Sequence, residues 1–226
     1  MRAPPSQTNI PTTSPAPGAS RWRLVRRELL AHAPYTALGT LSGMLVLGLL
    51  LWSRAPQTVS LRLFWLFHPL HVLLSAFVTT AIFRLHGNRG FWRTLAIGWI
   101  GSIGIATISD SLLPFAGEWL LDLPNRGLHL GLIEKPVLVN ALAAAGIAAG
   151  FTWPHTKLPH AGHVLLSTWA SLFHLSMALG PGLDWVTGLL IAGFLFLSVW
   201  LPCCTSDIVF PLLFVPRAKA PDTARQ

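Results

Sequence analysis

Long apolar stretches restrict the folds open to this chain. Of its 226 residues, 52% are hydrophobic and only 11% are charged, which is too little charge to cover the surface of an ordinary soluble domain. A helix needs about 20 mostly apolar residues to cross the hydrocarbon core of a bilayer. Six stretches qualify, at residues 35–53, 62–83, 92–113, 136–153, 160–180, and 185 to at least 201.

The apolar runs are continuous and do not alternate with a period of two, so they predict helices rather than membrane strands. We therefore expect an all-α, polytopic membrane protein with about six transmembrane helices. Stretch 136–153 is rich in Ala and Gly, which predicts close packing against neighbouring helices. Residues 1–30 have a Pro, Ser, Thr and Ala-rich start and four arginines within residues 21–27, which predicts a disordered tail ending in a basic cluster beside the membrane.

The distribution of charge predicts the topology. With a cytoplasmic N-terminus, twelve of the sixteen Lys and Arg residues lie on the cytoplasmic side, as the positive-inside rule requires. We expect both termini to be cytoplasmic and the protein to be integral to the cell (inner) membrane. An organellar membrane stays open, because no acidic residue precedes Glu28. The same distribution explains the net charge of +8 without a nucleic-acid partner.

A short sequence pattern occurs twice. His68-Pro-Leu-His71-Val-Leu-Leu-Ser75 returns as His160-Ala-Gly-His163-Val-Leu-Leu-Ser167, with six of eight positions identical. A Ser-Asp pair follows each copy, at Ser109-Asp110 and Ser206-Asp207, and a proline follows each aspartate four residues later. Two short matches in the same order indicate an internal duplication that kept His, Ser, Asp and Pro.

Each copy holds three predicted spans, so the second copy enters the membrane from the opposite side. This predicts two inverted three-helix repeats, related by a pseudo-two-fold axis in the membrane plane. The first repeat covers residues 31–114 and the second 136–215. Residues 115–135 connect them, with an interfacial helix as an option, and residues 216–226 form a second cytoplasmic tail.

The repeated residues predict two polar clusters. Residues at i, i+3 and i+7 share a helix face, so the two histidines of each copy point the same way, and the aspartate returns beside them on an antiparallel helix. Two imidazoles and a carboxylate suit zinc, iron or manganese. We expect the first cluster in the outer half of the membrane and the second in the inner half. The prolines predict a break that frees backbone carbonyls near each carboxylate. The predicted ligands are His68, His71, Asp110, His160, His163, Cys203, Cys204 and Asp207.

Other readings of these residues remain open. Histidines near helix starts often bond carbonyls, an aspartate can cap a helix or pair with an arginine, and the adjacent Cys203 and Cys204 can be small core residues. Their predicted cytoplasmic position favours reduced thiols over a disulfide. Ser75 and Ser167 are interpreted as bonding across helices. His174 is interpreted as a packing residue, and the connecting segment, with His129 and Glu134, is assigned no chemistry.

Three function classes fit these features. The first is a secondary transporter or channel-like permease for a divalent transition-metal ion, with histidine protonation as a means of proton coupling. The second is an intramembrane metal- or haem-dependent enzyme or redox protein, and the third is a non-transporting membrane assembly module. Phosphate-binding loops and common hydrolase motifs are absent, which favours a non-enzymatic protein without a nucleotide cofactor. The expected partners are the bilayer and the metal ion, with a homodimer as an option.

Overall fold

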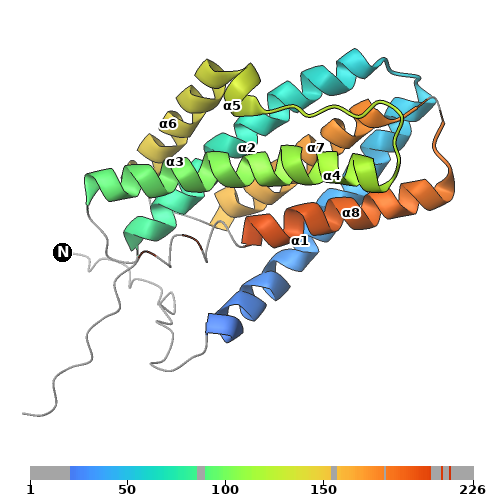
Figure 1. The fold of residues 1–226 in the computed structure, drawn as a ribbon. Coiled ribbons are helices and arrows are strands. Elements are labelled where there is room, and N and C mark those ends of the chain that lie inside the picture. The colour runs from blue at the N-terminus through green and yellow to red at the C-terminus, as the bar shows by residue number, and fades with distance from the viewer. Residues whose placement is uncertain are drawn as a thin grey trace, which may run out of the picture.

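Helices make up nearly all of the regular structure (Figure 1). The structure is a computed structural model that describes residues 21–85, 90–153, 157–180, 182–204, 210 and 214, with only the backbone at 21–25, 27, 28, 31, 157–160 and 204. Within these residues it contains no strand. The helices are α1 (Arg21–Trp52), α2 (Gln57–Leu85), α3 (Phe91–Thr107), the π-helical turn η1 (Ile108–Leu112), α4 (Leu113–Leu120), α5 (Gly131–Glu134), α6 (Pro136–Thr152), α7 (Lys157–Ala178) and α8 (Trp185–Cys204).

The expected all-helical fold is confirmed, and each of the six apolar stretches lies largely within a helix. Four helices are long and apolar enough to cross a membrane: His32–Trp52 of α1, Gln57–Leu85, Phe91–Leu120, and Trp185–Cys203 of α8. Helix α6 is apolar but only 17 residues long, and α7 is not among the four. The structure thus supports a membrane protein, whereas six crossings stay a prediction.

The third predicted helix runs further than expected. It was placed at residues 92–113, but α3, η1 and α4 form one continuous rod that ends at Leu120. The rod continues through Pro114 without the predicted break, and a π turn at Ile108–Leu112 precedes the proline instead. Pro114 lies in the first turn of α4, where a missing N–H is tolerated best.

Helices α2 and α7 pack against each other at the centre of the bundle (Figure 1). Helix α1 packs on α7 and α8, and α6 packs on α2 and α3. The Ala- and Gly-rich helix α6 approaches α2 at backbone distance: a Cβ added at Gly146 would collide with the Leu73 carbonyl, and one at Gly150 would lie 2.7 Å from the Phe77 carbonyl. The close packing predicted for this stretch is confirmed.

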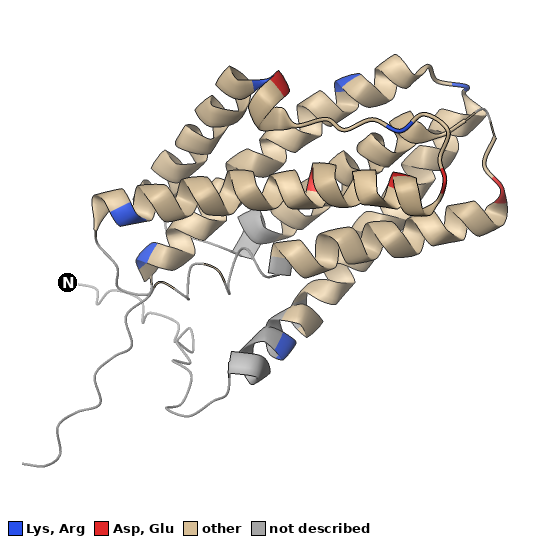
Figure 2. Cartoon of the chain, viewed as in Figure 1, with Lys and Arg blue, Asp and Glu red and all other residues tan. Residues whose placement is uncertain are grey.

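The bundle is apolar outside and polar at its centre. On α1, Leu45 is 72% exposed, whereas the facing surfaces of α2 and α7 bury histidines, serines and threonines. Polar side chains inside and apolar side chains outside are the arrangement that a lipid environment favours. In Figure 2, Lys and Arg lie near helix ends and in connections, while acidic positions also lie along the α3–α4 rod. Asp110 and Glu118 of this rod are 0% and 1% exposed.

Candidate metal centre

The π turn places Asp110 inside the bundle and leaves one backbone carbonyl without a helical donor. The Leu113 N–H bonds the Ile108 carbonyl, five residues back. The next bond in this register would join Pro114 to the Ser109 carbonyl, but proline has no N–H. The Ser171 hydroxyl of α7 donates to the Ser109 carbonyl instead, at 2.9 Å. The freed carbonyl expected near the carboxylate is therefore present, and it ties the rod to α7.

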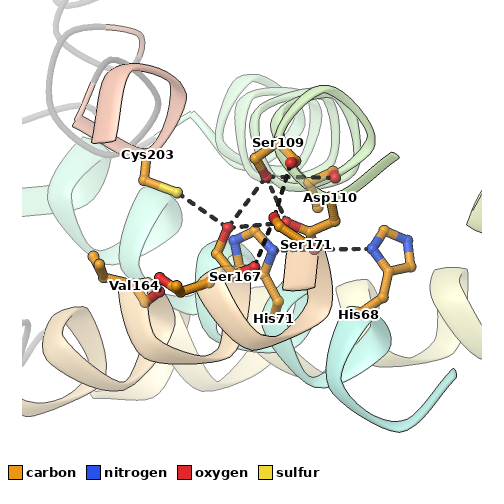
Figure 3. A network of polar contacts seen from close by, with 10 residues as sticks. His68, His71, Ser109, Asp110, Val164, Ser167, Ser171 and Cys203 are labelled. Carbon is orange, nitrogen blue, oxygen red and sulfur yellow. Dashed lines mark hydrogen bonds and ion pairs between the residues drawn. The ribbon is translucent and has the colours of Figure 1, made fainter. Parts of the chain in front are cut away.

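Four donors converge on the Asp110 carboxylate (Figure 3). Its Oδ2 lies 3.0 Å from His68 Nδ1 and 2.6 Å from His71 Nδ1. Its Oδ1 accepts the hydroxyls of Ser109 at 2.7 Å and Ser167 at 2.9 Å. An ionised carboxylate only accepts hydrogen bonds, so both imidazoles donate through Nδ1–H. In a neutral ring this tautomer leaves a lone pair on Nε2, the form that binds a metal.

The Nε2 atom of His71 is buried and has no hydrogen-bond partner among the described residues. Its ring stacks on that of His163, with centroids 4.5 Å apart and an interplanar angle of 18°. Each of His71, His163 and Cys203 contributes one potential ligand atom, and the three atoms lie within 4.8 Å of one another. All three side chains are buried. We call these three residues the central group.

Serines link the central group to the carboxylate. The Cys203 thiol lies 3.4 Å from the Ser167 hydroxyl, and Ser167 donates in turn to Asp110. Figure 3 shows Cys203 of α8, Ser167 of α7 and Asp110 of η1 in one connected network. The interpretation of Ser167 as a bond across helices is confirmed, whereas the Ser75 hydroxyl has no partner among the described residues.

The structure joins His68, His71 and Asp110, as the first predicted cluster requires. It departs from the sequence analysis in two ways. Asp110 is bonded to the histidines and serines and is not part of the central group. His71 and His163 were expected at different depths, yet their rings are in contact, because α2 and α7 pack side by side. The side chains of His160 and Cys204, and all of Asp207, lie outside the described residues.

Sequence reasoning missed a second buried pair. His174 Nδ1 lies 2.9 Å from Glu118 Oε1, and both side chains are buried. His174 is thus hydrogen-bonded to a buried carboxylate, which goes beyond the packing role predicted for it. The signal that could have found the pair was Glu118 itself, an ionisable residue in an otherwise apolar stretch. Ser171 was missed as well, although it lies one turn after Ser167.

Comparison with known proteins found no match to a protein-family model, to a curated protein or to a solved structure.

Proposed function

We propose that this protein is a secondary transporter or channel-like permease for a divalent transition-metal ion, with zinc as the best-fitting ion. The observation that carries the proposal is the buried Nε2 of His71, which Asp110 holds in the ligand tautomer beside His163 and Cys203. A carboxylate that orients a ligating histidine is a recurrent feature of metal sites. In this proposal Asp110 acts through His71 and does not touch the ion.

The charge of the site favours a divalent cation. With both imidazoles neutral, ionised Asp110 leaves one negative charge in a fully buried position. Metal binding would ionise the Cys203 thiol and add a second. A divalent ion balances the two, and such neutralisation matters because an uncompensated charge within a membrane is costly.

The donor atoms favour zinc over harder ions. Two imidazole nitrogens and one thiolate suit zinc, whereas magnesium, calcium and manganese prefer carboxylate and carbonyl oxygens. Tetrahedral zinc with these ligands places neighbouring donor atoms about 3.3 to 3.6 Å apart. The donors of the central group lie within 4.8 Å of one another, so a contraction of roughly 1 Å, within reach of side-chain rotation, completes three positions and leaves a fourth for water or an incoming ligand.

The packing pattern supports the inverted-repeat part of the proposal. In this scheme α1 corresponds to α6, α2 to α7, and the rod that begins with α3 to α8. A two-fold operation then turns the contacts of α1 with α7 and α8 into contacts of α6 with α2 and α3. Both sets of contacts are present. Transporters with inverted repeats bind their substrate where the repeats meet, near the bilayer midplane. His71 and His163 come from opposite repeats in this scheme, so the two predicted clusters merge into one central site.

The haem alternative fits the central group poorly. Two histidines that ligate one haem approach the iron from opposite faces of the porphyrin. The rings of His71 and His163 stack face to face at 4.5 Å, which leaves no space for a macrocycle between them. An assembly module without a metal explains the burial of these side chains but not the open Nε2 of His71.

Zinc flux into proteoliposomes tests the proposal. We expect wild-type protein to carry Zn²⁺ and His71→Ala to abolish the flux while the protein stays monodisperse and folded. His32→Ala is the matched control, since it removes a buried imidazole of α1 that is not in the central group, and it should leave flux intact. Equal flux in wild type and His71→Ala would refute the proposal, and a Soret band in purified protein would favour the haem alternative.

A further inference from the structure

The Glu118–His174 pair is a second buried ionisable site that the metal centre does not use. The ring of Phe64, itself fully buried, touches both sites: it stacks on His68 with centroids 5.2 Å apart and meets His174 edge-on at 5.4 Å. Neither Glu118 nor His174 shares a hydrogen bond with His68 or Asp110. The two sites are therefore neighbours that share no hydrogen bond, and the Phe64 ring contacts both.

The hydrogen bonds of the pair fix its protonation pattern. His174 Nε2 accepts the backbone N–H of His129 at 3.4 Å, so the ring proton is on Nδ1 and is donated to Glu118 Oε1. Glu118 Oε2 accepts the Gly127 N–H at 3.0 Å. All donors and acceptors are matched when Glu118 is ionised and His174 is neutral, which leaves the buried pair with a net charge of −1.

This pattern makes the pair responsive to one proton. A proton added at His174 Nε2 neutralises the pair and so removes a charge that is costly away from water. The same proton converts Nε2 from an acceptor into a donor, so the bond from the His129 amide is lost. Two protonation states result: one keeps the hydrogen bond from the His129 amide, and the other has no net charge.

A partly exposed histidine–carboxylate contact lies beside the buried pair. His129 Nδ1 lies 3.2 Å from Glu134 Oε1, and these side chains are 27% and 38% exposed. The His129 ring also contacts that of His174, with centroids 5.6 Å apart. An exposed imidazole–carboxylate pair thus adjoins the buried one, which is how a proton from solvent can reach a site in the interior.

The part of the connecting segment that lies between α4 and α5 (residues 121–130) links the pair to the metal centre. It contributes the His129 and Gly127 amides, and it leads directly into α5, whose first residue, Gly131, lies against the His68 ring so closely that a Cβ there would collide with Nε2. His129 is therefore only two residues from Gly131, whose backbone lies against the His68 ring. His68 in turn bonds Asp110.

We propose that Glu118 and His174 form a proton-binding site, distinct from the central group, which is loaded through His129 and Glu134 and whose protonation releases the His129 amide. The proton comes from water and ends on His174 Nε2, while the Nδ1 proton stays shared with Glu118. In the transport cycle this site holds the coupling proton, and that role alone rests on the function proposed above.

Titratable groups from several elements surround His174. The rod contributes Glu118, and the loop at residues 121–130 contributes His129, which in turn contacts Glu134 of α5. Helix α2 contributes His68, on the other side of Phe64. The described part of α8 has no acidic, basic or histidine residue. The segment's remaining charges, Asp122 and Arg126, pair with each other at its exposed start.

Two measurements on the full chain in nanodiscs test the site without any metal. The first is the side-chain ¹⁵N signals of histidine, followed over about pH 5 to 8, in which the His174 signal is identified by its absence in His174→Gln. The second is hydrogen exchange of the His129 amide, corrected for its intrinsic rate. We expect this amide to exchange faster as the His174 imidazole becomes protonated. His174→Gln should make that exchange independent of pH, and Glu118→Gln should suppress the protonation. Asp122→Asn, which removes an exposed acid of the same segment, should behave as wild type.

Exchange of the His129 amide that stays pH-independent in wild type, or an unchanged titration in Glu118→Gln, would overturn the proposal. Zinc binding separates its failure from that of the metal centre. We expect Zn²⁺ affinity to fall in His71→Ala and to stay within about twofold of wild type in His174→Gln. Equal loss in both variants would show that the sites are one. If wild type binds no Zn²⁺, the proposed function fails, while the histidine titration still decides the proton site.

Discussion

The rings of His71 and His163 stack at 4.5 Å, although the two histidines lie on helices from opposite halves of the chain. Each is the second histidine of its His-x-x-His motif. Their contact means that the two copies of the motif meet at the α2–α7 interface. Asp110 orients His71 in that contact, because it lies 2.6 Å from His71 Nδ1 and leaves Nε2 as the buried nitrogen without a hydrogen-bond partner among the described residues.

Replacing Asp110 by Asn should weaken metal binding without removing a ligand. The amide has one acceptor oxygen where the carboxylate has two, so it cannot receive all four donors, and a histidine has to change tautomer. Loss of such an orienting carboxylate typically costs 10- to 100-fold in metal affinity. We expect Zn²⁺ affinity to fall by about that factor in competition titrations, and unchanged affinity would exclude an orienting role for Asp110.

Replacing Cys203 by Ser should change the spectrum of the bound metal. Cobalt(II) ligated by a thiolate has an intense charge-transfer absorption, and a hydroxyl cannot supply it. We expect cobalt-loaded wild type to show this band and Cys203→Ser to lose it. Cys204→Ser is the matched control because it removes the adjacent thiol. If Cys203→Ser kept the band and Cys204→Ser lost it, the sulfur ligand would be Cys204, and our assignment of Cys203 would be wrong.

The close contact between α6 and α2 predicts a stability difference between two glycines. A methyl group at Gly146 collides with the Leu73 carbonyl and lies 2.9 Å from Ala76 Cβ, whereas one at Gly48 of α1 meets nothing within 4 Å. We expect Gly146→Ala to lower the free energy of unfolding by about 1–3 kcal/mol, and Gly48→Ala to be neutral or to raise it by up to about 1 kcal/mol. Denaturant unfolding in mixed micelles measures both. Similar values for the two variants would mean that α6 does not approach α2 this closely.

Asp184 caps α8 and should make the start of that helix sensitive to acid. Its carboxylate accepts the Thr187 hydroxyl and the backbone N–H groups of Thr187 and Val186. The Thr187 hydroxyl, followed by these amides, holds the pKa of Asp184 below its ordinary value. The cap therefore stabilises α8 at pH values above the ordinary aspartate pKa, and the stabilisation disappears as pH falls through the lowered pKa.

Amide exchange in the first turn of α8 measures this effect. We expect protection to decrease on acidification in wild type, and to be low at all pH values in Asp184→Ala. Asp184→Asn keeps a capping oxygen but does not titrate, so its protection should not depend on pH after correction for intrinsic rates. The same acid-induced loss in Asp184→Asn would assign the effect to another group.

The sequence was sufficient to place the helices and one half of the site. Apolar runs near the length of a membrane span have few alternatives to helix, and His68 and His71 share a helix face whatever their partner. Pro114 predicted a break beside Asp110; the rod is continuous there, and the departure from α-helix is a π turn at Ile108–Leu112.

The remaining features depend on how the helices pack. Helical periodicity states which residues share a face but not the register in which α2 lies against α7, so the contact of His71 with His163 could not be derived. The same limit hid Glu118 and His174, since their pairing joins α4 to α7. The repeat nevertheless selected both histidines of the stacked pair.

X-ray absorption of the protein purified without a histidine tag and loaded with zinc shows directly whether the central group binds the metal. We expect one Zn²⁺ per chain with at least two imidazole nitrogens at about 2.0–2.1 Å and one sulfur at about 2.3 Å, and loss of that sulfur in Cys203→Ser. A shell made only of oxygen, or no bound metal at all, would exclude a zinc site at these residues.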